Sequence, residues 1–182
     1  GGSAAKVKLQ ITIPDGTVYT YTLGGGSYET FPLTGGNGSY HLDILENVRD
    51  DLYALAFSQD IEVNISDEFK PFLYPNQYVW FTEDSQAVKL GREISNKSSN
   101  DLSYVQNVYH YVIENIVYDD KKAENIPTDY LPNLDQTLKD KTGICFDYAS
   151  LMAAMLRSQS VPTRLEVGYS GEAYHAWVSV YL

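Results

Sequence analysis

Cys145 and His175 could act together as a nucleophile and its general base. Cys145 is the only cysteine in the chain and His175 is one of three histidines. The thiolate is the reactive form of cysteine, and an ordinary thiol is mostly protonated at neutral pH. Cys145 lies two residues after Gly143, near the start of an apolar run that predicts a helix over residues 144–159. The free N–H groups of its first turn carry about half a positive charge, which favours a thiolate and could hold a developing oxyanion.

His175 would supply the neighbouring imidazole if the strand that it starts lies against the beginning of this helix. Trp177, two residues later, would share a strand face with His175 and could form a wall of the site. Residue types alone leave another interpretation open. In that interpretation Cys145 is a small buried apolar residue and His175 is an ordinary structural histidine.

The elements that would position this pair divide the sequence into two domains, residues 1–83 and 84–182, and the expected fold class is α+β. The first domain has short runs of alternating polarity separated by turn residues, which predict an antiparallel β-sandwich-like domain. The runs are KVKLQITI, TVYTYTL, SYETFPL, SYHLDILENV, YALAFSQ and IEVNIS, and a Pro-Asp-Gly turn predicts a hairpin of the first two. The second domain predicts helices over 85–95, 101–116 and 144–159, one or two helical turns over 134–140, and a final hairpin of TRLEVGY and HAWVSVYL. Residues 71–81 are expected either to bridge the domains or to line a ligand groove.

Composition excludes several classes of protein. The 24 acidic against 13 basic residues give a net charge of −11, which opposes binding to nucleic acid or anionic membranes. One cysteine forbids an intrachain disulfide and a thiolate-rich zinc site, and neither a metal nor another cofactor is expected. No apolar run approaches the roughly 20 residues of a membrane span. The 16 tyrosines with a single cysteine favour a secreted or cell-surface bacterial protein, and the start GGSAAKVK resembles a trimmed end without a signal peptide.

The two other histidines and one run of charged residues are interpreted as structural. His41 lies in an expected strand and His110 on an expected helix, and both are interpreted as structural. The run Asp119-Asp120-Lys121-Lys122 predicts a solvated turn, because calcium would require a denser group of oxygen ligands.

Six short blocks occur in the order typical of one family. They are Gly143-Ile144-Cys145, Asp147-Tyr148-Ala149, Met155-Leu156-Arg157, Val161-Pro162-Thr163-Arg164, Gly168-Tyr169 and His175-Ala176-Trp177. Over about residues 86–182 the chain resembles the core of the transglutaminase-like superfamily. The resemblance implies a papain-like α+β core with Cys145 as nucleophile and His175 as base. It also implies a thioester formed from a carboxamide or peptide carbonyl of a protein or peptide substrate, and its release by an amine or by water.

One member of the family's site has no counterpart in this sequence. The family orients its histidine with an aspartate or asparagine on the next strand, and the chain ends at Leu182, so the third triad acid is absent from it. Asp147 matches a different position and is expected to make a local hydrogen bond or to place charge at the helix start. Loss of the orienting acid costs on the order of 10⁴ in rate in a serine triad, so we expect weak or no activity.

An unpaired last strand would also favour a homodimer or a strand swap. The alternative function is a non-catalytic extracellular binding or structural module on a transglutaminase-like scaffold.

Overall fold

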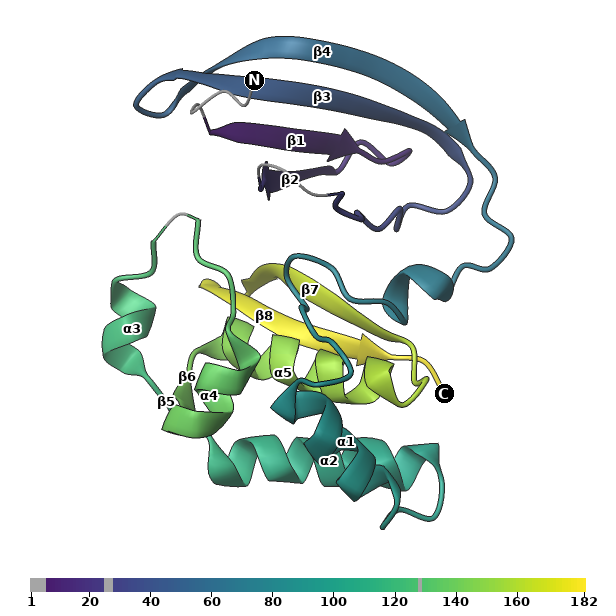
Figure 1. The fold of residues 1–182 in the computed structure, drawn as a ribbon, viewed down its shortest axis with the longest axis vertical. Helices are drawn as coiled ribbons and strands as arrows, with labels where there is room; N and C mark the ends of the chain where they lie inside the picture. The colour runs from purple at the N-terminus through teal and green to yellow at the C-terminus, as the bar shows by residue number, and fades with distance from the viewer. Residues whose placement is uncertain (1–5, 25–27, 128) are drawn as a thin grey trace. The chain divides into compact units, whose positions relative to one another are not determined.

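The structure is a computed structural model that describes residues 6–24, 28–127 and 129–182. It divides into two compact units, Gly1–Pro71 and Phe72–Leu182. Antiparallel strands form the described part of the first unit, and helices with a β-hairpin form most of the second (Figure 1). The α+β class expected from the sequence is therefore confirmed. The domain boundary between residues 83 and 84 stays a prediction, and it lies inside the second unit.

The first unit contains one four-stranded antiparallel sheet with the strand order β2-β1-β3-β4 (Figure 1). Its strands are β1 (Val7–Thr12), β2 (Val18–Leu23), β3 (Gly38–Arg49) and β4 (Leu52–Val63). β1 and β2 form the predicted hairpin. The second sheet of a sandwich is not confirmed, because the described residues of this unit contain this sheet alone.

Two of the expected strands differ from the structure. In SYETFPL, the described residues 28–33 form no strand, because alternation without a neighbouring strand to pair with supplies no ladder of hydrogen bonds. YALAFSQ and the first three residues of IEVNIS form the single strand β4, because Asp60 between them pairs with His41 within the ladder instead of forming a turn.

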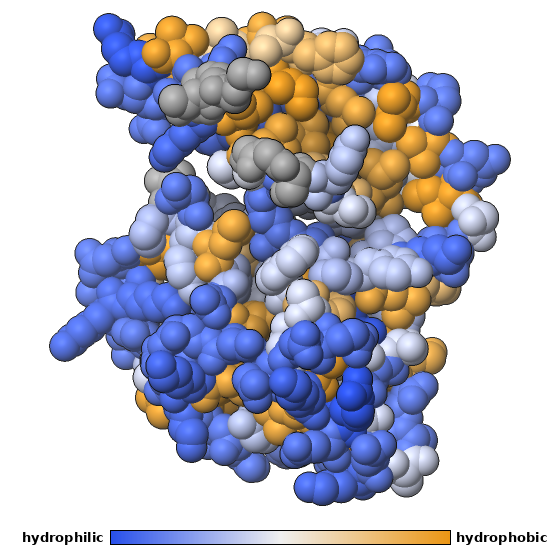
Figure 2. Space-filling view, viewed as in Figure 1, coloured by the Kyte–Doolittle hydropathy of each residue, from blue (hydrophilic) through white to orange (hydrophobic). Residues whose placement is uncertain are grey.

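Apolar side chains lie both inside and outside this sheet. Leu9, Ile11, Tyr21 and Tyr40 are buried. β4, which is at the edge of the sheet, exposes Leu52, Leu55 and Phe57. Figure 2 shows apolar surface gathered over the first unit and a largely hydrophilic surface on the second unit in the same view.

The second unit is built around one buried helix, α5. Its elements are α1 (Gln86–Ser95), α2 (Asp101–Asn115), β5 (Val117–Tyr118), α3 (Asp120–Glu124), α4 (Leu134–Asp140), β6 (Thr142–Gly143), α5 (Cys145–Ser158), β7 (Thr163–Ser170) and β8 (Ala173–Val180). The predicted helices and the final hairpin are confirmed within one or two residues at each end, except that β8 starts before the expected run. α5 packs against α1, α2, α4, β7 and β8, and its apolar residues point in nearly every direction, which is typical of a helix inside a core.

The crossing of α1 and α5 depends on a glycine. A Cβ on Gly91 would lie 3.0 Å from the carbonyl oxygen of Met155 and 3.1 Å from the hydroxyl of Tyr104. That hydroxyl donates a hydrogen bond of 2.7 Å to the same carbonyl of Met155. Three helices therefore meet at a position where one more carbon atom has no space.

A buried arginine connects α5 to the segment before α1. Arg157 is 4% exposed, and its guanidinium donates from Nε to the carbonyl of Thr163 (2.8 Å) and from Nη1 to the carbonyl of Tyr74 (2.9 Å). Burial lowers the pKa of Arg157 to about 10, so the group stays protonated at neutral pH. Residues 71–81 follow the short 3-10 helix η1 (Lys70–Phe72) and place Val79 in the core. A bridging or ligand-binding role for this segment stays a prediction.

Candidate active site

Cys145 is the first residue of α5, as the sequence predicts, and its side chain is partly exposed. The chain reaches this position through β6, which pairs in parallel with β5. The backbone N–H of Asp119 donates to the carbonyl of Gly143 at 2.9 Å and fixes the entry to the helix. A Cβ on Gly143 would lie 2.9 Å from the Cβ of Asp147, so this entry requires glycine. The thiol thus lies beside free N–H groups of a helix start.

Tyr118 is the aromatic neighbour of the thiol. Its hydroxyl interacts with both the side chain and the backbone of Cys145. Burial is the main cause that raises the pKa of Tyr118, the charge of Cys145 raises it further, and a hydrogen bond from the Cys145 backbone N–H opposes both. The Tyr118 ring packs edge-on against Tyr148, with 6.1 Å between the ring centroids. A neutral phenol beside the thiol can donate a hydrogen bond to a thiolate.

The sequence does not predict that Tyr118 lies beside Cys145. Tyr118 reaches Cys145 through the pairing of β5 with β6, in which it lies opposite Gly143. Two strands of two residues each leave no periodic pattern in the sequence.

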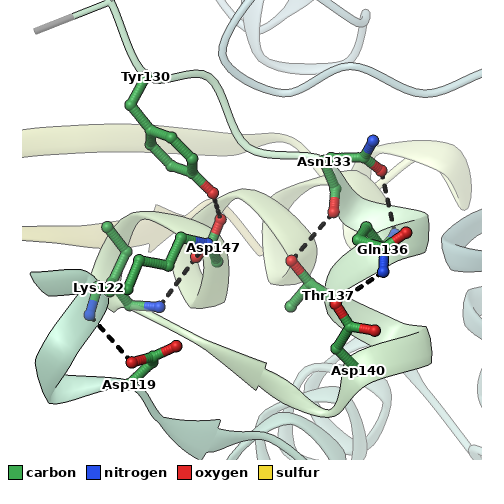
Figure 3. A network of polar contacts seen from close by, with 9 residues as sticks. Asp119, Lys122, Tyr130, Asn133, Gln136, Thr137, Asp140 and Asp147 are labelled. Atoms are coloured by element: carbon green, nitrogen blue, oxygen red, sulfur yellow. Dashed lines mark hydrogen bonds and ion pairs between the residues drawn. The ribbon is translucent and has the colours of Figure 1, made fainter. Parts of the chain in front are cut away.

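Asp147 lies two residues after Cys145 and has no exposed surface. Its Oδ2 accepts hydrogen bonds from the Nζ of Lys122 (2.7 Å) and from the backbone N–H of Ile144 (2.9 Å), and its Oδ1 accepts one from the hydroxyl of Tyr130 (Figure 3). The local hydrogen bond expected for Asp147 is therefore present. The solvated turn expected over 119–122 is wrong for Lys122, because its ammonium group pairs with this buried carboxylate.

Lys122 and Tyr130, whose side chains both donate to Asp147, differ in charge. Burial acts to lower the pKa of Lys122, but hydrogen bonds and charge attraction from Asp147 and Tyr130 outweigh it and raise this pKa. Burial, followed by the hydrogen bond to Asp147, raises the pKa of Tyr130. Lys122 is therefore a cation and Tyr130 a neutral donor at physiological pH.

α4 holds the other end of the segment that precedes Cys145. The side chain of Asn133 caps the helix by accepting from the N–H of Gln136 at 3.0 Å, and Thr137 donates to the Asn133 carbonyl at 3.0 Å (Figure 3). The helix ends at Lys141 in the left-handed conformation, with φ of 56°. This turn directs the chain into β6 and then into Cys145.

His175 lies near the start of β8, which runs beside α5 in the same direction, so His175 and Cys145 lie toward the same end of the unit (Figure 1). Ala176 is buried and Val178 packs against the core, whereas His175 is exposed on the opposite face of the strand. Within the described residues, no hydrogen bond or ion pair joins His175 to Cys145. The structure brings Cys145 together with Tyr118, and the pairing of Cys145 with His175 as a catalytic pair stays a prediction.

Trp177 shares the face of His175, as expected for residues two apart in a strand. Its ring lies 3.3 Å from where a Cβ on Gly168 would be, and Gly168 pairs with His175 across the hairpin. Trp177 therefore leans across the hairpin beside His175. Its role as a wall of the site stays a prediction.

Phe146, the residue after Cys145, contributes aromatic surface at the helix start. Its ring centroid lies 6.0 Å from that of Tyr78 and 6.3 Å from that of Tyr130. Tyr130 also donates to Asp147, so aromatic packing and the polar network hold the same segment.

Residues 6–24, 28–127 and 129–182 contain no group of three or more His, Cys, Asp or Glu side chains arranged to hold a metal ion. Over the same ranges, no helix combines the length and apolar character required to cross a membrane. The chemistry open to the described site is that of a thiol at a helix start beside a phenol.

Comparison with known proteins gives a family and a fold. The family profile described as the transglutaminase-like superfamily matches residues 88–182. A UPF0252 protein from Methanocaldococcus jannaschii is 30% identical over 96 residues, which are 46% of this chain and 27% of that protein. The match thus spans about a quarter of that relative's length.

Two solved structures resemble the whole chain. One is described as a "putative cysteine protease" from Cytophaga hutchinsonii, with a TM-score of 0.52 and 17% identity, covering 99% of this chain and 74% of that one. The other is the periplasmic domain of TgpA from Pseudomonas aeruginosa, with a TM-score of 0.49 and 14% identity, covering 100% of this chain and 84% of that one. At this identity the first likeness concerns the fold alone.

Proposed function

This chain belongs to the transglutaminase-like superfamily, and we propose that its second unit transfers or hydrolyses acyl groups of protein or peptide substrates through a thioester on Cys145. The Cys145 sulfur attacks the carbonyl carbon of a carboxamide or peptide bond. The C–N bond then breaks, and ammonia or an amine leaves with a proton. A second amine completes a cross-link, or water completes a hydrolysis, and either regenerates the thiol.

The residues have separate roles in this proposal. The N–H groups of the first turn of α5 would stabilise the negative oxygen of the tetrahedral intermediate. His175 would take the thiol proton and deliver it to the leaving amine. β8 carries His175 near its start and runs beside α5 in the same direction, which is compatible with this role (Figure 1).

The observation that carries the proposal is the placement of Cys145 as the first residue of a buried helix, next to the Tyr118 hydroxyl. Both features stabilise a thiolate relative to a thiol. We therefore expect iodoacetamide to alkylate Cys145 in the folded chain faster at neutral pH than an unperturbed thiol.

The matched control is the same thiol in urea-unfolded chain, where the helix start and Tyr118 no longer act on it. Mass spectrometry of the alkylated peptide gives the rate at each pH. A folded midpoint above about pH 8, equal to that of the unfolded chain, would contradict an activated nucleophile.

Turnover distinguishes the two outcomes of the thioester. Incorporation of a labelled primary amine into a glutamine-containing peptide reports cross-linking, and ammonia or amine release without incorporation reports hydrolysis. Cys145→Ser is expected to abolish both, and His175→Asn to lower either by about 10³-fold. Full activity of His175→Asn would exclude His175 as the base.

A non-catalytic binding or structural module is the second candidate. It is supported by the exposed position of His175 and by the absence, within the described residues, of a hydrogen bond or ion pair between His175 and Cys145. An ordinary alkylation midpoint together with no turnover of either kind would favour it.

Two other expectations remain part of the proposal. A homodimer or strand swap predicts a mass of twice the 20.4 kDa chain in light scattering, and a monomer at all concentrations would exclude it. The secreted or cell-surface location rests on the tyrosine-rich composition.

A further inference from the structure

A buried carboxylate shares the first turn of α5 with the thiol that the proposed function requires as a thiolate. Asp147 occupies the first turn of α5, two residues after Cys145, and has no exposed surface. A carboxylate there completes the helix start, but its charge opposes a second negative charge on Cys145. The site therefore requires a compensating cation.

We propose that Lys122 is a positioning residue for Cys145: it neutralises the Asp147 carboxylate and thereby leaves the positive end of α5 free to stabilise the thiolate. The proposal rests on the proposed function of Cys145. It assigns to α3 a part in the reactivity of a helix that follows it by some twenty residues.

The contacts of Asp147 support this assignment. Three donors saturate the carboxylate, but two of them, the Ile144 N–H and the Tyr130 hydroxyl, are neutral. Lys122, at 2.7 Å, is the cation paired with Asp147 among the described residues. Because Asp147 is fully buried, water cannot replace this charge when Lys122 is removed.

The position of Lys122 is itself fixed. Asp119 caps α3 by accepting from the Lys122 backbone N–H at 3.0 Å (Figure 3). The Lys122 Nζ also lies 4.6 Å from the centroid of the Tyr130 ring, where an aromatic face attracts a cation. The cap on its backbone and the Tyr130 ring beside its ammonium group thus both hold Lys122 in position against Asp147.

The expected magnitude follows from the charge that is left behind. A charge left uncompensated in the same helical turn as the sulfur, at an effective dielectric constant of about 20 and with the thiol partly exposed, corresponds to about tenfold in thiolate fraction at neutral pH. The ionisable groups around the thiol come from four elements: Tyr118 on β5; Asp120 and Lys122 on α3; Asp147 and Tyr148 on α5; and, without contact, His175 on β8.

The test measures the pH profile of Cys145 alkylation in the full chain with iodoacetamide. Lys122→Gln keeps an amide donor for Asp147 but removes the charge, and we expect alkylation about tenfold slower at pH 7. Lys122→Met combined with Asp147→Asn removes both charges, and we expect a rate within about threefold of the unsubstituted chain. Lys121→Gln, the adjacent exposed lysine on α3, is the matched control and should leave the profile unchanged.

Restoration by the second substitution is the decisive outcome, because a purely structural network would be damaged further by losing both partners. A folded Lys122→Gln variant with an unchanged profile would overturn the proposal, and so would a double variant slower than Lys122→Gln. If Lys122→Gln fails to fold, Asp147→Asn alone is compared with the double variant. Faster alkylation of Asp147→Asn, which keeps Lys122, than of the double variant supports the proposal, and equal rates of the two variants overturn it.

The profile of the unsubstituted chain separates this proposal from the proposed function. An ordinary midpoint there contradicts the activated nucleophile, whereas a Lys122-dependent shift from that midpoint would still support the charge compensation.

Discussion

Gly91→Ala is expected to destabilise the second unit, although helix propensity alone predicts the opposite. The new Cβ would lie 3.0 Å from the carbonyl oxygen of Met155 and 3.1 Å from the hydroxyl of Tyr104. The first atom belongs to the backbone of a fully buried helix, and the second is held by its hydrogen bond to that same carbonyl. Neither can move away without separating α1 from α5.

Three terms decide the magnitude. Alanine in place of glycine contributes about 1 kcal/mol in favour of the helix. An extra methyl group in a packed core costs about 1–3 kcal/mol, and loss of the buried Tyr104–Met155 hydrogen bond costs about 1 kcal/mol. The sum is a net loss of roughly 1–3 kcal/mol in the free energy of unfolding.

Urea unfolding measures this change as a lower midpoint at constant slope. Lys89→Ala, at an exposed position of the same helix, is the control and should change stability by less than about 0.5 kcal/mol. If Gly91→Ala instead stabilised the chain by about 1 kcal/mol, the close approach of α1 to α5 would be refuted.

Three further predictions concern the site and each unit. Tyr118→Phe removes the hydroxyl beside Cys145 and should slow its alkylation at pH 7 about threefold, and an unchanged rate would exclude a donor role. A hydrogen bond to Asp60 is the main cause that raises the pKa of His41 above its value in the unfolded chain, so protonated His41 stabilises the first unit. This stabilisation is complete below about pH 6.5 and is lost as the pH rises through the folded pKa. The midpoint of urea unfolding should therefore fall as the pH is raised from 5.5 to 8, and Asp60→Asn should make this midpoint less dependent on pH. Arg157→Lys keeps the charge but cannot make both carbonyl contacts, and should lower stability by about 1–3 kcal/mol in the same assay.

The sequence predicts the helices of the second unit because their signals are local. The helix predicted over residues 101–116 begins where the side chain of Asn100 accepts a hydrogen bond from the Ser103 N–H at 2.9 Å. Cys145 falls in the predicted first turn because a glycine and an apolar run mark the start of α5. Such features depend on neighbours within about four residues, which a pattern of residue types records.

Contacts between distant parts of the chain were not predictable in this way. Lys122 was expected in solvent because its run of charges resembles a surface turn, and nothing local indicates a buried carboxylate 25 residues away. The strand expected over SYETFPL does not form within its described residues, for a related reason. Alternating polarity shows which side chains could share a face, but only a partner strand supplies the hydrogen bonds. His175 shows the same limit, since the order of residue types does not specify toward which face of β8 it points.

The attachment of α3 has a consequence for hydrogen exchange. α3 contains no buried residue, and its link to α5 is the pairing of Lys122 with Asp147. Its amide protons should therefore exchange with solvent through a local opening, whereas those of α5 should require unfolding of the whole unit. Each such opening separates the ammonium group from the carboxylate beside Cys145, so the exchange rate of five surface amides would report how often the thiol loses its compensating charge.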